Sequence, residues 1–222
     1  MAVAQRSMRG VALLCWLAAG PLCDGVSLRL HTPSGPVLGN NEGSIAAFWG
    51  VPYAKPPTGK LRFRPPEPAE PWEEPLDLSL PPAGFSMSCP QMWYAPKKPL
   101  TRSAAWEGPL PPNGSMVGTE DCLRLHVYVP LPQAVGSHGK KLPVMVWFHG
   151  GAYMVGDAWR DGLFDGSELA LRTRAIVVSI QYRLGLLGFL ADARLKQWLP
   201  ARGPMQWPNG TTGNWGMLDQ QW

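Results

Sequence analysis

The sequence predicts an α/β domain in which antiparallel edge hairpins lead into a mostly parallel central sheet. Residues 27–48 alternate apolar and polar side chains in short bursts separated by glycine and proline, which is typical of antiparallel hairpins. Residues 142–148 and 175–181 are nearly continuous apolar runs rich in β-branched side chains, the pattern of buried parallel strands. Residues 165–173, between them, fit a short helix, so the three segments predict a strand–helix–strand crossover.

Three further segments complete the expected architecture. Residues 123–129 alternate cleanly and fit a half-buried strand beside the parallel pair. Residues 51–72 are rich in proline, and because large aromatic side chains are interleaved with the prolines, an ordered surface loop is favoured over a flexible linker. Residues 213–222 predict a helix whose single apolar face is left unfinished, and from this we expect a truncated domain.

The composition narrows the class of protein. The chain has 222 residues, 45% hydrophobic and 16% charged, which is the ordinary globular range. The formal net charge is +4, and no run of lysine or arginine exceeds two residues, so a nucleic-acid partner is not expected. No pattern indicates a cofactor or a metal, and the sequence carries no signal for an oligomeric state.

The first 25 residues have the layout of a secretory signal peptide. Arg6 and Arg9 precede an apolar run, and small or turn-forming residues follow at 20–25, where we expect cleavage. The apolar run is about half the length that a transmembrane helix needs, so no membrane span is expected; the alternative is an uncleaved amphipathic anchor. The mature domain is then residues 26–222, located in the secretory-pathway lumen or outside the cell.

The secretory pathway permits both disulfide formation and glycosylation, so the cysteines and two sequons become informative. Cys89 and Cys122 remain after the leader is removed, and an oxidising environment favours one disulfide between them over two buried free thiols. Asn113 and Asn209 each begin an Asn-Gly-Ser/Thr triplet in a predicted loop, where glycosylation is expected in a secreted protein. Trp93 lies between the cysteines with other aromatic residues, which either line a cleft or serve packing.

The strongest local signal for chemistry is Phe148-His149-Gly150-Gly151-Ala152-Tyr153, directly after the apolar run 142–148. Acyl transfer requires preorganised donors for a developing oxyanion, and backbone amides supply them where no side chain intrudes. The segment is therefore a candidate oxyanion-binding turn. The alternative is an ordinary glycine turn at the end of a strand.

Several sequence blocks, in order along the chain, resemble the type-B carboxylesterase/cholinesterase family of α/β-hydrolases. They are Phe48-Trp49-Gly50-Val51-Pro52-Tyr53-Ala54-Lys55-Pro56-Pro57, Leu61-Arg62-Phe63, Pro66-Glu67-Pro68, Glu120-Asp121-Cys122-Leu123, Gln181-Tyr182-Arg183-Leu184-Gly185, Gly188-Phe189-Leu190 and Gly213-Asn214-Trp215-Gly216-Met217-Leu218-Asp219-Gln220. Together with the His-Gly-Gly segment they cover nearly all of residues 26–222. The resemblance implies the amino-terminal part of an α/β-hydrolase fold.

The resemblance also implies roles for individual residues. Gly151 and Ala152 would donate to the oxyanion with Gly150 beside them, although alanine stands where the family more often has a third glycine. The loop closed by Cys89 and Cys122 would border the active-site gorge, supported by an ion pair between Arg62 and Glu120. The tryptophan that holds choline in cholinesterases has no counterpart at the same spacing here, so a choline ester is not expected.

The family's serine stands in a Gly-x-Ser-x-Gly elbow, followed by an acid and a histidine. No Gly-x-Ser-x-Gly occurs in this chain, so we expect the nucleophile, acid and base to lie outside it. The sequence thus predicts a serine carboxylic ester hydrolase by descent, inactive as given, that acts on a small-molecule ester once completed by a carboxy-terminal part. The alternatives are a noncatalytic adhesion module with the same fold and an unstable truncated product.

Overall fold

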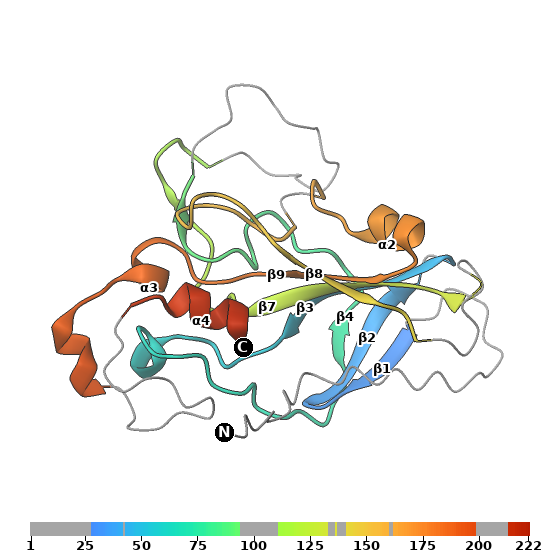
Figure 1. Cartoon of the computed structure of the whole chain (residues 1–222), viewed down its shortest axis with the longest axis horizontal. Coiled ribbons are helices and arrows are strands. Elements are labelled where there is room, and N and C mark those ends of the chain that lie inside the picture. Colours follow the sequence, from blue (N-terminus) through green and yellow to red (C-terminus); the bar gives the residue numbers. More distant parts are fainter. Residues whose placement is uncertain are drawn as a thin grey trace, which may run out of the picture.

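The computed structural model describes residues 28–41, 43–93, 111–132, 136, 141–159, 162–198 and 213–222. The elements in chain order are β1 (Leu28–Thr32), β2 (Gly35–Asn41), β3 (Ile45–Pro52), the 3-10 helix η1 (Gly59–Leu61), β4 (Leu76–Leu78), β5 (Gln91–Met92), β6 (Met116–Val117), β7 (Arg124–Pro130), β8 (Val144–Phe148), α2 (Ser167–Thr173), β9 (Ile176–Ile180), α3 (Gly185–Phe189), the 3-10 helix η2 (Ala193–Trp198) and α4 (Trp215–Gln221). Figure 1 shows the larger sheet at the centre of the molecule.

The larger sheet is mixed, with the strand order β1-β2-β3-β7-β9-β8 and β4 paired to β2. The pairing is antiparallel from β1 through β9, as the hairpin pattern of residues 27–48 predicts for its first part. The predicted parallel pair is present as β8 and β9, joined by the crossover that contains α2. Among the described strands, parallel pairing thus occurs at β8/β9 and at β2/β4, and antiparallel pairing is more frequent.

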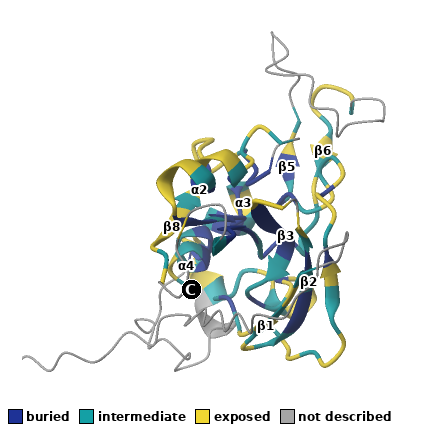
Figure 2. Ribbon diagram, turned by 90° about the vertical axis from the view of Figure 1, so that its right-hand side faces the viewer, coloured by how far each residue is buried: buried dark blue, intermediate teal, exposed yellow. Residues whose placement is uncertain are grey.

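Strand β7 lies between β3 and β9 and is buried over most of its length, as Figure 2 shows for the centre of the sheet. The expectation of a half-buried strand is wrong here because both faces of β7 are covered. Val127 and Val129 pack with Phe48 on one face, and Tyr128 packs with Trp159 on the other. Cross-strand packing on two faces makes this strand the centre of the core.

The structure corrects the predicted burial of β8. Four of its five residues are exposed, with Val144 at 54% and Val146 at 53% of full accessibility. The apolar run does form a strand, but it stands at the end of the sheet and pairs with β9 on one side. Within the part of the chain that the structure describes, neither a second strand nor a helix covers it, so its side chains remain open to solvent.

The predicted helices are present, and glycines allow two of them to pack closely. Residues 165–173 contain α2, and residues 213–222 contain α4. Gly188 of α3 and Gly216 of α4 both approach the carbonyl oxygen of Arg183 so closely that an added Cβ would lie 2.3 and 2.4 Å from it. Any larger residue at either position would therefore push its helix away from the end of β9.

The proline-rich segment 51–72 is an ordered loop fixed to the sheet at both ends, as predicted. The Tyr53 hydroxyl donates to the Gln181 carbonyl at 2.7 Å, and the Trp72 indole N–H donates to the Pro36 carbonyl at 2.7 Å. The predicted signal peptide and the sequon at Asn209 lie outside the described residues. Among the helices that the structure does describe, none is both long and apolar enough to cross a bilayer.

Candidate active site

The glycine loop, residues 149–156, follows β8 directly and turns at the end of the parallel pair. At its start, the Tyr182 hydroxyl donates to the His149 carbonyl at 2.5 Å, and the two rings stack with their centroids 4.3 Å apart. At its middle, the Gly185 amide donates to the Tyr153 carbonyl at 2.7 Å. Both contacts come from the segment that follows β9, so the end of this strand holds one side of the loop.

The backbone of the glycine loop is strained at its tip. Gly151 has φ of 127°, and Ala152 and Tyr153 follow with φ of 53° and 60°, in the left-handed region. Non-glycine residues adopt this region at a cost, and consecutive examples are concentrated at functional sites. A Cβ on Gly151 would lie 1.7 Å from the Val155 carbonyl oxygen, whereas one on Gly150 would meet nothing within 4 Å. The loop therefore requires glycine at 151.

Three consecutive residues are exposed at this tip, Gly150, Gly151 and Ala152. The turn is closed by the Met154 and Val155 amides, which donate to the Gly151 carbonyl at 3.0 and 3.1 Å. Within the described residues, the amides of Gly150, Gly151 and Ala152 have no protein acceptor. A short turn that leaves successive N–H groups without main-chain partners is the arrangement that binds an anionic oxygen.

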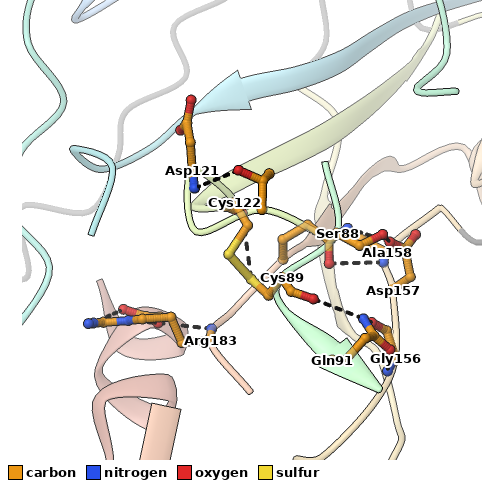
Figure 3. The surroundings of a disulfide bond; sticks show 12 residues. Ser88, Cys89, Gln91, Asp121, Cys122, Gly156, Asp157, Ala158 and Arg183 are labelled. Atoms are coloured by element: carbon orange, nitrogen blue, oxygen red, sulfur yellow. Dashed lines mark hydrogen bonds and ion pairs between the residues drawn. A yellow bond between two sulfur atoms is a disulfide. The ribbon is translucent and has the colours of Figure 1, made fainter. Parts of the chain in front are cut away.

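The described ends of a second loop, the disulfide loop (residues 89–122), lie against the first. Cys89 and Cys122 are joined with their Cα atoms 5.1 Å apart, and both are fully buried. Gln91 lies in β5, which pairs with β6 inside this loop, and its side-chain amide reaches across to Gly156 (Figure 3). The disulfide loop is thus joined to the glycine loop at Gly156.

A buried carboxylate strengthens the contact between the two loops. Asp157 follows the glycine loop and accepts hydrogen bonds from the Ser88 hydroxyl, from the Gln181 side-chain amide at 2.9 Å and from the Trp159 amide at 2.6 Å. The Gln181 side-chain oxygen in turn accepts from the Ala158 amide at 3.2 Å. Figure 3 shows Ser88, Asp157 and Ala158 close together beside the disulfide. Several donors around one buried carboxylate compensate for its lost hydration.

The structure brings together the residues of the expected ion pair. The Arg62 guanidinium donates to both carboxylate oxygens of Glu120 at 2.6 and 2.5 Å. Glu120 lies two residues before Cys122, so this bidentate pair connects the proline-rich segment to the disulfide loop. Both side chains are partly exposed, which limits how much the pair stabilises the fold.

Two further residues that the sequence singled out, Asn113 and Trp93, lie in described parts of the chain. Asn113 is exposed in a turn that leads into β6, a position accessible to modification. The Trp93 ring packs edge-on against Phe85, which precedes the disulfide loop, with centroids 5.0 Å apart. Across the described ranges, no group of three or more acidic, histidine or cysteine side chains has the geometry to hold a metal ion.

Sequence reasoning did not single out Gln91, Asp157 or the partner of Arg183. In the structure Arg183 makes a bidentate ion pair with Asp219 of α4, and both side chains are almost fully buried. A single sequence shows that these residues are polar, but it does not show that they are buried, because their partners are 65, 69 and 36 positions away. For Gln91, its position two residues after Cys89 is the one local signal.

The mixed sheet, the crossover through α2 and the glycine loop after β8 define this molecule as part of an α/β-hydrolase. The carboxylesterase family model matches residues 26–222. The chain belongs to the carboxylesterase family. The predicted family resemblance is therefore confirmed.

Individual relatives agree with this assignment. The chain is 39% identical to human cocaine esterase, in an alignment that covers 98% of the chain. It is 42% identical to para-nitrobenzyl esterase of Bacillus subtilis (strain 168), in an alignment that covers 72% of the chain. The solved structure of a thermophilic PNB esterase matches 88% of the chain with a TM-score of 0.63 and 35% identity. The chain spans about a third of each relative: 35% of cocaine esterase, 28% of para-nitrobenzyl esterase and 33% of the thermophilic enzyme.

Proposed function

We propose that this chain supplies the oxyanion-binding part of a serine carboxylic ester hydrolase whose substrate is a small-molecule ester. In the complete enzyme, a serine activated by histidine attacks the ester carbonyl, and the amides of Gly151 and Ala152, with Gly150 beside them, hold the tetrahedral oxyanion. Water then releases the acyl group. The observation that carries the proposal is a run of three exposed residues whose amides have no protein acceptor among the described residues, on a backbone strained at Gly151 and Ala152.

The nucleophile, the acid and the base lie outside residues 1–222 in this proposal. His149 is not available as the base, because its ring is buried against Tyr182 and its Nδ1 lies 3.0 Å from the Gly150 carbonyl oxygen. Its contacts with Tyr182 hold the start of the glycine loop in place. The residual effect of an oxyanion hole alone falls far short of useful turnover.

Two experiments test the proposal. The 222-residue chain is first incubated with a fluorophosphonate, a serine-directed reagent, and examined by mass spectrometry; we expect no adduct and no hydrolysis of p-nitrophenyl acetate. Residues 26–222 are then joined to the segment of para-nitrobenzyl esterase that follows its aligned region, and we expect both hydrolysis and a serine adduct. Replacing the elbow serine of that segment by alanine is the control.

An adduct on the 222-residue chain would place a nucleophile inside it and contradict the proposal. A joined protein that unfolds cooperatively but neither hydrolyses the ester nor reacts with the fluorophosphonate would also contradict it. That second outcome would favour the noncatalytic adhesion module. The intact glycine loop argues for the hydrolase, because adhesion does not need a run of unpaired amides at the end of β8.

We also propose that the chain enters the secretory pathway, loses its leader within residues 20–25 and is glycosylated at Asn113 and Asn209. The exposure of Asn113 in a turn supports modification there. Expression in cultured secretory cells should give a protein whose mobility increases after treatment with an N-glycosidase. The variant Asn113→Gln should lose part of that shift, and an unchanged shift would exclude modification at this position.

A further inference from the structure

The side chain of Gln91 pairs with the backbone of Gly156 as a neighbouring strand would. Gln91 Nε2 donates to the Gly156 carbonyl at 2.7 Å, and the Gly156 amide donates to Gln91 Oε1 at 2.8 Å. The second hydrogen on Nε2 is donated to the Cys89 carbonyl at 3.1 Å. Gln91 is 8% exposed, so the amide makes three hydrogen bonds where water has little access.

Gly156 controls the position of the residues that precede it. With φ of 133°, it lies so close to the start of the loop that an added Cβ would be 2.3 Å from both the Gly150 carbonyl oxygen and His149 Nδ1. Gly151 touches Val155 in the same manner. The two limbs of the glycine loop, residues 149–151 and 155–156, are therefore packed backbone to backbone. A displacement of Gly156 must be passed on to Gly150 and Gly151.

The two limbs are held from different directions. Tyr182 and Gly185, after β9, hold His149 and Tyr153. On the other side, among the described residues of the disulfide loop, Gln91 bonds directly to the glycine loop through its side chain, while Ser88 bonds to Asp157 just after it. The disulfide fixes Cys89, and the Gln91 amide is bonded to the Cys89 carbonyl. The position of Gly156 thus depends on the disulfide loop through the Gln91 side chain.

We propose that Gln91 is a positioning residue for the candidate oxyanion hole, which sets the place of the amides at 150–152 by holding Gly156 against the disulfide loop. This inference rests on the proposed function for its catalytic meaning. Its structural content is separate: the turn that presents these amides depends on the Gln91 amide. A displacement of about 1 Å at such donors is enough to cost about a hundredfold in rate.

The test uses hydrogen exchange of the Met154 and Val155 amides in the 222-residue chain, measured by NMR. Both amides bond to Gly151, and neither bonds to Gln91, so they report whether the effect is passed along the loop. Gln91→Met keeps the length of the side chain and removes all three hydrogen bonds. We expect these two amides to exchange about tenfold faster, with β7 and β9 unchanged. Gln221→Met, the same change at an exposed glutamine, is the matched control.

A second variant tests the hydrogen-bond pattern itself and covers the case in which Gln91→Met does not fold. In Gln91→Glu, burial and the two facing carbonyl oxygens raise the pKa of the introduced carboxyl group above its ordinary value. When protonated, this group accepts from the Gly156 amide and donates its single O–H to the Gly156 carbonyl, so that only the bond to Cys89 is lost. When ionised, it faces both carbonyl oxygens without a donor. We expect protection of Met154 and Val155 close to that of the unmodified chain at about pH 5, and its loss at about pH 8, after correction for intrinsic exchange.

Protection that stays within about twofold of the unmodified chain in both variants would overturn the proposal. So would exchange that rises equally in the loop and in β9, because that result indicates general destabilisation. A pH-independent result for Gln91→Glu would also overturn it. None of these readouts needs turnover, so a joined enzyme that fails to hydrolyse esters would count against the proposed function alone.

Discussion

Arg183 and Asp219 form a buried bidentate ion pair that fixes helix α4 to the end of β9. The guanidinium Nε and Nη2 donate to the two carboxylate oxygens at 2.8 and 2.6 Å, and the Arg183 amide adds a third bond at 3.0 Å. The remaining nitrogen donates to the Arg64 carbonyl at 2.8 Å. One arginine thereby connects the sheet, the carboxy-terminal helix and the proline-rich segment.

Removing one member of this pair should be costly. Asp219→Asn leaves a buried guanidinium without its countercharge, and we expect the free energy of unfolding to fall by about 3–5 kcal/mol. Arg172→Met, which removes the exposed Arg172–Glu168 pair of α2, is the control and should change it by less than about 0.5 kcal/mol. Urea denaturation followed by tryptophan fluorescence measures both, and equal small changes would refute the structural role of the pair.

The disulfide joins Cys89 to Cys122, 33 positions apart in the sequence. The double variant Cys89→Ala/Cys122→Ala should lose about 3–4 kcal/mol of unfolding free energy, because the unfolded chain gains freedom that the crosslink removes. The comparison is made by urea denaturation with the unmodified chain kept oxidised. If reduction of the unmodified chain does not give the same loss as the double variant, the effect comes from the alanines and not from the crosslink.

The adjacent glycines 150 and 151 should tolerate the same substitution by alanine to very different degrees. Gly151→Ala places a methyl group against the Val155 carbonyl at a backbone conformation that alanine disfavours, and should cost about 2 kcal/mol or more. Gly150→Ala places the methyl group in open space and should change stability by less than about 1 kcal/mol. Thermal unfolding monitored by circular dichroism separates the two, and equal effects would contradict the described loop conformation.

His126 should make the fold sensitive to acid. Burial is the main cause that lowers the pKa of His126 to about 4, while the charges of Asp157 and Asp165 partly oppose the shift. Its Nδ1 accepts from the Gly50 amide at 3.1 Å, so the neutral ring is the form that fits. The unfolded chain binds a proton near pH 6.5 and the folded chain near 4, so stability falls by about 3 kcal/mol as the pH falls through this window.

His126→Asn retains an acceptor for the Gly50 amide and should remove this component of the pH dependence. His31→Asn, at an exposed histidine of β1, is the matched control and should leave it in place. Urea midpoints measured between about pH 4 and about pH 7 give the slopes. A variant at 126 whose stability still falls as steeply as that of the unmodified chain would assign the acid sensitivity to other groups.

Local pattern was sufficient for much of this architecture. The hairpins of residues 27–48, the strands within 142–148 and 175–181, the helix between them and the glycine loop could all be predicted, because each depends on periodicity or on residues adjacent in the chain. The joined cysteines and the ion pair of Arg62 with Glu120 were expected from the leader and from the family resemblance. The structure brings both pairs together.

The sequence by itself determined which segments become strands and helices and where the backbone must bend, since those properties follow from local sterics and side-chain spacing. Only the tertiary structure decided that β7 is central and β8 stands at the sheet end with its apolar side chains exposed. The same holds for the partners of Gln91, Asp157 and Arg183. Burial of a polar group depends on what the rest of the chain places against it, and contacts between distant residues leave no local pattern.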